Sequence, residues 1–149
     1  MQRLYSMRVQ LLQSMINKLR DRCLARKAYV SPRHSASMPL NKRDEKADSQ
    51  LKADMWSHCA RTTQDLLHRL RTNMKSIRLV VIDYAGFSTD FGDVQFLFNA
   101  YKQAVEIVVD IEFSFDMTSR SDILNDNGVS NKFNCRIGQR KRSRSLITN

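Results

Sequence analysis

The stretch Leu79-Val80-Val81-Ile82 decides the fold class, because it can form either a short buried strand or the last apolar turn of a helix. Three of its four residues are β-branched, which favours a strand. A strand needs a partner, however, and no second convincing strand lies near it in the sequence. We therefore expect the helix that precedes this stretch to continue through it.

An apolar stripe upstream predicts that helix. Apolar residues recur at three- and four-residue spacing from about Asp48 to Ile77, which is the period of an amphipathic helix. With the decisive stretch included, the helix spans about 48–84. We interpret three residues of the stripe as core or interface residues, namely Trp56, Leu66 and Leu70.

A break in the helical pattern follows at Ala85-Gly86-Phe87-Ser88-Thr89-Asp90. Gly86 can end one helix in the left-handed conformation, and Ser88, Thr89 or Asp90 can cap the next. A second apolar stripe, which includes Val105, predicts a helix over about 90–114. Two long helices joined by a short loop bury their stripes against each other. The expected fold class is therefore all-α, with a coiled-coil-like helical hairpin as the core over 48–116.

The segments on either side of this core have distinct compositions. Residues 1–30 predict a basic amphipathic helix, and their first 20 residues contain four basic residues and no acid. This N-terminus is typical of a mitochondrial presequence, although an ordinary surface helix is the favoured interpretation. Residues 31–47 contain both prolines and predict a polar linker. Periodicity fades over 117–149, which predicts a poorly ordered tail.

Composition limits the classes of protein to which the chain can belong. Its 149 residues suffice for about one domain, and 25 basic against 15 acidic residues give a net charge of +10. That excess favours an anionic partner. No apolar run approaches the roughly 18 residues of a membrane-spanning helix. Three cysteines without C-x-x-C spacing argue against a disulfide scaffold, so we expect an intracellular protein.

Charge is unevenly distributed along the chain. Residues 1–78 carry 17 basic and 6 acidic groups, 79–126 carry 2 basic and 9 acidic groups, and 127–149 carry 6 basic groups and no acid. Basic segments bind phosphate-rich partners by releasing counterions. The candidate contacts for an anionic partner are Arg20, Arg22, Arg26, Lys27, Lys132, Arg136, Arg140, Lys141, Arg142 and Arg144.

Two short motifs have known counterparts. Arg33-His34-Ser35-Ala36-Ser37-Met38-Pro39 fits R-x-x-x-S-x-P and resembles a ligand motif of the 14-3-3 phosphoserine-binding family. The resemblance covers seven residues, says nothing about the fold, and implies Ser37 as a phosphorylation site. Asp90-Phe91-Gly92 matches the magnesium-binding tripeptide of protein kinases. No glycine-rich phosphate loop or H-R-D segment accompanies it, so we reject that identification.

No motif in the sequence indicates catalysis, a cofactor or a metal site, because nucleophile, phosphate-loop, dinucleotide and zinc spacings are all missing. We expect a non-enzymatic intracellular interaction subunit or adaptor that binds a protein partner and uses its basic segments for an anionic one. A nucleic-acid-binding accessory protein of the nucleus or the mitochondrion is one alternative. An orphan or isoform product without a defined activity is another. The nucleus is the favoured compartment.

Overall fold

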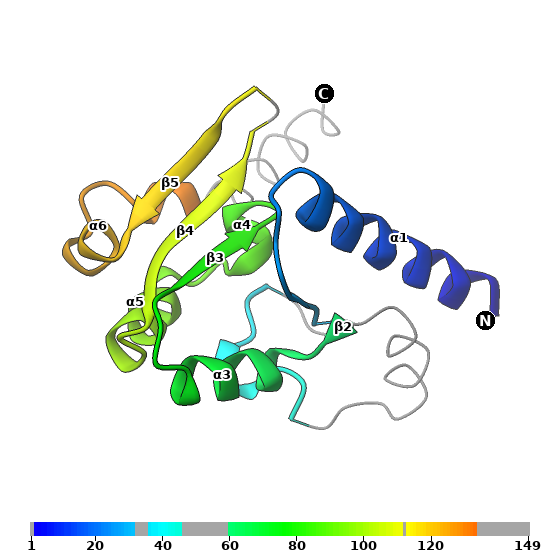
Figure 1. The fold of residues 1–149 in the computed structure, drawn as a ribbon, viewed down its shortest axis with the longest axis horizontal. Coiled ribbons are helices and arrows are strands. Elements are labelled where there is room, and N and C mark those ends of the chain that lie inside the picture. Colours follow the sequence, from blue (N-terminus) through cyan, green and yellow to red (C-terminus); the bar gives the residue numbers. More distant parts are fainter. Residues whose placement is uncertain (1, 32–35, 46–59, 112, 134–149) are drawn as a thin grey trace, which may run out of the picture.

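A three-stranded mixed sheet lies at the centre of the structure, a computed structural model (Figure 1). Its strands are β3 (Ile77–Val81), β4 (Ala104–Asp110) and β5 (Phe115–Ser119), in that spatial order. β3 and β4 run parallel, and β4 and β5 form an antiparallel hairpin. The fold class is therefore α/β, and the expected all-α, coiled-coil-like hairpin is wrong. The structure describes residues 2–31, 36–45, 60–111 and 113–133.

Residues 79–81 of the decisive stretch belong to the strand β3. The strand that pairs with β3 comes much later in the chain. Leu79 lies opposite Ile107 and Val80 opposite Val108 in the parallel ladder. The expected helix over 90–114 ends at Ala100, and a run rich in β-branched residues forms β4. The β-branched residues of 104–110 are the sequence signal for the strand that pairs with β3, but their spacing also fits the second half of a helical stripe.

The remaining helices are short, and the sequence caps most of them. α3 (Thr63–Thr72) begins at a capping box formed by Thr62 and Asp65. α5 (Phe91–Ala100) begins at Asp90, one of the three expected caps, whose side chain accepts a hydrogen bond from the Asp93 N–H. Between them, α4 (Tyr84–Phe87) is a single turn. Gly86, expected to end a helix, lies inside this turn.

One face of the sheet carries the main core. Leu79, Ile107 and Val109 point to this face and pack with buried residues of α3, α5, α6 (Arg120–Asn125) and α7 (Ser130–Phe133). Phe98 and Phe133 are fully buried there. Residues 117–133, expected to belong to a poorly ordered tail, thus form the end of β5 and two helices of the core. Residues 134–149 lie outside the described part of the chain.

A helix was expected over residues 1–30, and the structure has a shorter one that ends at Asp21 and packs against β1. α1 (Gln2–Asp21) buries Ile16 against Ala28 of β1 (Ala28–Tyr29), which pairs in parallel with β2 (Ala60–Arg61). Among the described residues, no helix has the length and apolarity needed to cross a bilayer.

The described part of the expected polar linker, residues 36–45, packs against the body of the fold. It contains η1 (Leu40–Lys42), and Leu40 belongs to the main core. The buried Arg43 guanidinium donates to the carbonyl oxygens of Ala36, Met38 and Phe87, which ties this segment to the end of α4. Proline and polar residues predicted a loop correctly here, but they gave no sign of these buried contacts.

Candidate interaction surface

Two of the basic residues expected to contact an anionic partner form ion pairs within the chain. Arg22 Nε lies 2.7 Å from the Asp110 Oδ2 atom, and the Asp110 side chain is only 3% exposed. Lys132 Nζ lies 2.9 Å from the Asp116 Oδ2 atom. Each of these cations therefore has an acidic neighbour that the sequence pattern did not indicate.

The other expected contact residues are placed as follows. Arg20 is half-buried on α1, and Arg26 and Lys27 are exposed after it. Ser37, the candidate phosphorylation site, is exposed. The residues that lie outside the described part of the chain are Trp56, Arg136, Arg140, Lys141, Arg142 and Arg144.

The residues expected to be core or interface residues lie in different parts of the fold. Leu70 is completely buried in the main core, whereas Leu66 is half-buried beside it. Val105 lies on β4 at an irregularity in the pairing with β3. Ile77 pairs with Ala104 and the next residue, Arg78, pairs with Glu106, so the ladder passes over Val105. Leu70 is therefore a core residue, Leu66 packs against the core, and Val105 belongs to the sheet.

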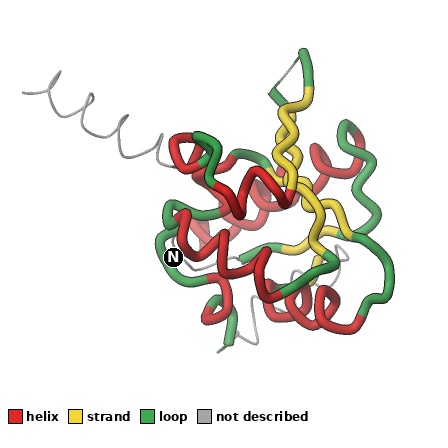
Figure 2. Tube along the Cα trace, turned by 90° about the vertical axis from the view of Figure 1, so that its left-hand side faces the viewer, coloured by secondary structure: helices red, strands yellow, loops and turns green. Residues whose placement is uncertain are grey.

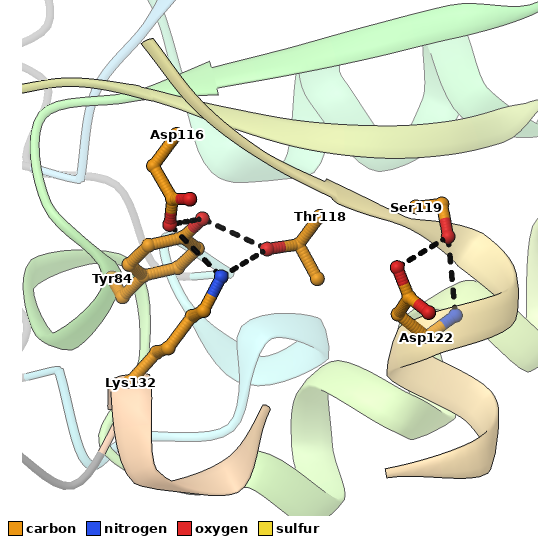
Figure 3. A network of polar contacts seen from close by, with 6 residues as sticks. All are labelled: Tyr84, Asp116, Thr118, Ser119, Asp122 and Lys132. Carbon is orange, nitrogen blue, oxygen red and sulfur yellow. Dashed lines mark hydrogen bonds and ion pairs between the residues drawn. The ribbon is translucent and has the colours of Figure 1, made fainter. Parts of the chain in front are cut away.

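A partly buried polar network connects β5, α4 and α7 (Figure 3). The Tyr84 hydroxyl donates to Asp116 Oδ2 at 2.7 Å and lies 2.9 Å from Thr118 Oγ1. Lys132 Nζ donates to both Asp116 Oδ2 and Thr118 Oγ1. Because Tyr84 has one hydroxyl hydrogen and gives it to Asp116, the Thr118 hydroxyl donates to the Tyr84 oxygen.

This network is suited to holding the fold together. Burial raises the pKa of Tyr84 to about 12, and the Asp116 carboxylate opposes its ionisation as well. The phenol is therefore a hydrogen-bond donor at neutral pH and a poor general base. Hydrogen bonds from Tyr84 and then Lys132 lower the pKa of Asp116, which keeps it an acceptor. The polar groups of Tyr84, Asp116, Thr118 and Lys132 therefore hydrogen-bond to one another.

A cavity of about 690 Å³ lies between α1, the carboxyl end of β3 and the segment 36–43. Its volume falls within the range of small-molecule sites, and its walls are largely apolar. Three of the polar side chains that line it have partners in the chain: Ser31 donates to Asp44, Arg43 to three carbonyls, and Asp83 accepts from the Gly86 N–H. The described residues lining it thus present no pair arranged for acid–base work.

The most unusual surface of the molecule is at the β4–β5 hairpin, which projects beyond the helices (Figure 2). Four large apolar side chains are at least half exposed on it, and Phe113 at the turn is 98% exposed. We call this set the hairpin surface: Ile111, Phe113, Phe115 and Met117. Large apolar side chains clustered in solvent mark interaction sites more often than inert surface. Within β5, Phe115 and Met117 alternate with polar residues and point to one face of the sheet, which was the signal that sequence analysis missed, whereas Ile111 follows β4 and points to the opposite face.

Comparisons with known proteins leave the function to be inferred from the structure. No protein-family model matches the chain, and no curated protein or solved structure matches it. Within the described ranges, no group of three or more His, Cys, Asp or Glu residues is placed to hold a metal ion. The hairpin surface is accordingly the feature from which we argue function.

Proposed function

We propose that this chain is a non-enzymatic interaction subunit that binds a protein partner through the hairpin surface. The observation that carries the proposal is the exposure of Phe113, together with three further apolar side chains at least half exposed on the same hairpin. Aromatic side chains of this kind serve as anchors that fill pockets on a partner. Large apolar side chains exposed on one projecting hairpin are costly to keep in water unless a partner covers them.

The geometry of the hairpin also supports partner binding. Phe113 is held at the turn by a hydrogen bond from its N–H to the Ile111 carbonyl, and the Ile111 N–H donates to the Ser114 carbonyl. These two backbone hydrogen bonds hold the described residues of the turn, Ile111, Phe113 and Ser114, in place. A preorganised turn loses less conformational entropy on binding than a mobile loop would.

Site-specific photo-crosslinking in cells tests this proposal. A photoreactive phenylalanine analogue replaces Phe113 in the full chain, and we expect an adduct of one defined mass. Phe96 on α5 is the matched control, because it is also an exposed phenylalanine but lies away from the hairpin. The proposal is wrong if position 113 yields no adduct, or if positions 113 and 96 yield the same set of adducts.

A further inference from the structure

We propose that the cavity between α1 and the carboxyl end of β3 binds a small, neutral and largely apolar molecule that carries one hydrogen-bond-accepting oxygen, as a long-chain alcohol or ketone does. This binding is separate from the function proposed above, because no residue of the hairpin surface lines the cavity. The volume of about 690 Å³ suits a small molecule. The position of the cavity, its walls and one buried arginine identify the class of ligand.

The cavity lies where proteins with parallel strands commonly bind ligands. β3 runs parallel to β4, and the cavity is lined by the residues at the carboxyl end of β3, namely Val80, Val81, Ile82 and Asp83. In open α/β sheets, ligands bind in the crevice outside the carboxyl ends of the parallel strands. α1 forms another wall of the cavity with residues that include Leu19, because its last turns lie near the end of β3 (Figure 1). The position is thus that of a ligand site.

Apolar side chains from three helices form much of the wall. They include Leu12 and Ile16 of α1, Leu40 of η1 and Leu66 of α3. Water forms few hydrogen bonds beside such walls, and lining atoms that face a gap lack dispersion partners across it. An apolar molecule supplies these dispersion contacts and displaces poorly bound water. The body of the ligand is therefore apolar.

Arg43 supplies the polar feature of the site. It lines the cavity and is only 5% exposed. Its Nε donates to the Met38 carbonyl at 2.9 Å, and its two terminal nitrogens donate to the carbonyls of Phe87 at 2.7 Å and Ala36 at 3.0 Å. A guanidinium has five N–H groups, so two of them have no acceptor within the described residues. Buried donors are costly to leave without partners, and an oxygen of the ligand provides the acceptor.

Neighbouring carboxylates favour a neutral oxygen on the ligand. Burial lowers the pKa of Arg43, and the charges of Asp93 and Asp44 oppose that shift, so both carboxylates lie near the guanidinium. Asp83 also lines the cavity. These acidic residues compensate the charge of Arg43, and a carboxylate or phosphate on the ligand would be buried without an excess of positive charge to balance it. A carbonyl or hydroxyl oxygen accepts from the two N–H groups without that cost.

Fluorescence titration of the full chain with N-phenyl-1-naphthylamine, a neutral apolar dye, tests the site. We expect the emission of the dye to rise and to saturate at one dye molecule per chain. Displacement of the dye then compares 1-decanol with decanoate, which have the same chain length and differ in charge at about pH 8. 1-Decanol should displace the dye at a concentration on the order of tenfold lower, because its oxygen carries no charge into the cavity.

Two enlarged side chains fill the cavity from different walls. Val80→Phe acts from the sheet and Leu12→Trp acts from α1, and each should weaken dye binding by about tenfold or more. Val105→Phe is the matched control in the sheet, because Val105 is also a half-buried valine, and Leu11→Trp is the matched control on α1. Neither Val105 nor Leu11 lines the cavity, so both controls should keep the wild-type affinity. Circular dichroism shows whether each variant is folded.

Loss of dye affinity in the folded cavity variants, with wild-type affinity in their controls, supports the site. The absence of saturable dye binding would overturn it, as would wild-type affinity in both Val80→Phe and Leu12→Trp. Loss of dye binding in Phe113→Ser would place the dye on the hairpin surface and refute the cavity site. Displacement by decanoate at the lower concentration would refute the neutral oxygen.

Discussion

At the scale of single residues, the polar network around Tyr84 shows how local chemistry holds distant segments together. Tyr84 follows β3, Asp116 and Thr118 belong to β5, and Lys132 belongs to α7. Thr118 is almost fully buried, so its hydroxyl group needs the partners that Tyr84 and Lys132 provide. The Tyr84 ring also packs edge-on against Phe133, with ring centroids 5.2 Å apart. The network thus fixes α7 to the sheet.

Replacing Tyr84 by phenylalanine tests the strength of this network. Tyr84→Phe removes one hydroxyl and leaves the Thr118 hydroxyl with fewer partners, so we expect the free energy of unfolding to fall by about 1–3 kcal/mol. Urea denaturation measures the change. Tyr101→Phe is the control, because Tyr101 is a half-buried tyrosine outside the network, and it should change the free energy far less. Equal effects of the two substitutions would show that the network contributes nothing specific.

The same network predicts a dependence of stability on acid pH. Hydrogen bonds from Tyr84 and Lys132 lower the pKa of Asp116 below its ordinary value of 3.8. A carboxyl group with a lowered pKa stabilises the fold above the unfolded-state pKa, and that contribution is lost as pH falls through the folded-state pKa. We expect Asp116→Asn to be less stable than the wild type at pH 7, with the gap closing below about pH 4.

Urea denaturation over this pH range measures that gap, and Glu45→Gln, which alters an exposed carboxylate, is the control. A gap between wild type and Asp116→Asn that stays constant from pH 7 to pH 3 would contradict the assignment.

At the scale of elements, an ion pair between Arg22 and Asp110 links the end of α1 to the end of β4. Arg22, which follows the last residue of α1, donates to Asp110 at the end of β4, 88 residues later. The Asp110 carboxylate is buried and therefore depends on its polar partners. Ile16 adds an apolar contact with β1. These two contacts fix the end of α1 beside the end of β4 and beside β1.

Arg22→Met tests this contact, because methionine keeps the apolar stem of the side chain and removes its charge. We expect the free energy of unfolding to fall by about 1–3 kcal/mol, since a buried carboxylate loses a charged donor. Adding Asp110→Asn should recover part of the loss, which a double-mutant cycle in urea measures. Arg26→Met alters an exposed arginine and is the control. If Arg22→Met and Arg26→Met have the same effect, the ion pair does not hold α1.

At the scale of the whole molecule, charge and apolar exposure are separated along the chain. The hairpin surface lies in the acidic region 79–126, whereas five of the six C-terminal basic residues lie beyond Phe133. Lys132, the sixth, is paired with Asp116. The proposed protein contact at the hairpin and the expected anion contact of the C-terminal basic residues would involve different residues, so different variants test them.

Truncation tests the basic residues by themselves. Phe133 is fully buried, so the shortened chain ends after it to keep the core intact. We expect the full chain to bind duplex DNA with an affinity that falls on the order of 10²-fold between 50 and 200 mM salt, because about five counterions are released. The chain 1–133 should lose this binding and keep its fold, as fluorescence anisotropy and circular dichroism would show. Equal DNA affinity of both chains would locate the contacts elsewhere.

The sequence alone determined those features that depend on neighbouring residues. A helix was expected within residues 1–30 and is observed over Gln2–Asp21, because helical hydrogen bonds link residues four apart, whereas the strand β1 at the end of that range was not expected. Asp90 was among the expected caps and does begin α5, since a cap needs only the next three residues. The absence of a long apolar run was equally visible, and no described helix has the character of a membrane span.

Only the tertiary structure decided whether 79–82 and 104–110 are helix or strand. Leu79 pairs with Ile107, 28 residues along the chain, so the hydrogen bonds that make β3 a strand lie far outside any local window. Apolar runs of this length suit either a buried strand or a buried helix turn. The ion pair of Arg22 with the buried Asp110 and the position of β5 at an edge of the sheet likewise depend on residues far apart in the chain. A strand is defined by its partner, and the position of that partner is a property of the folded chain.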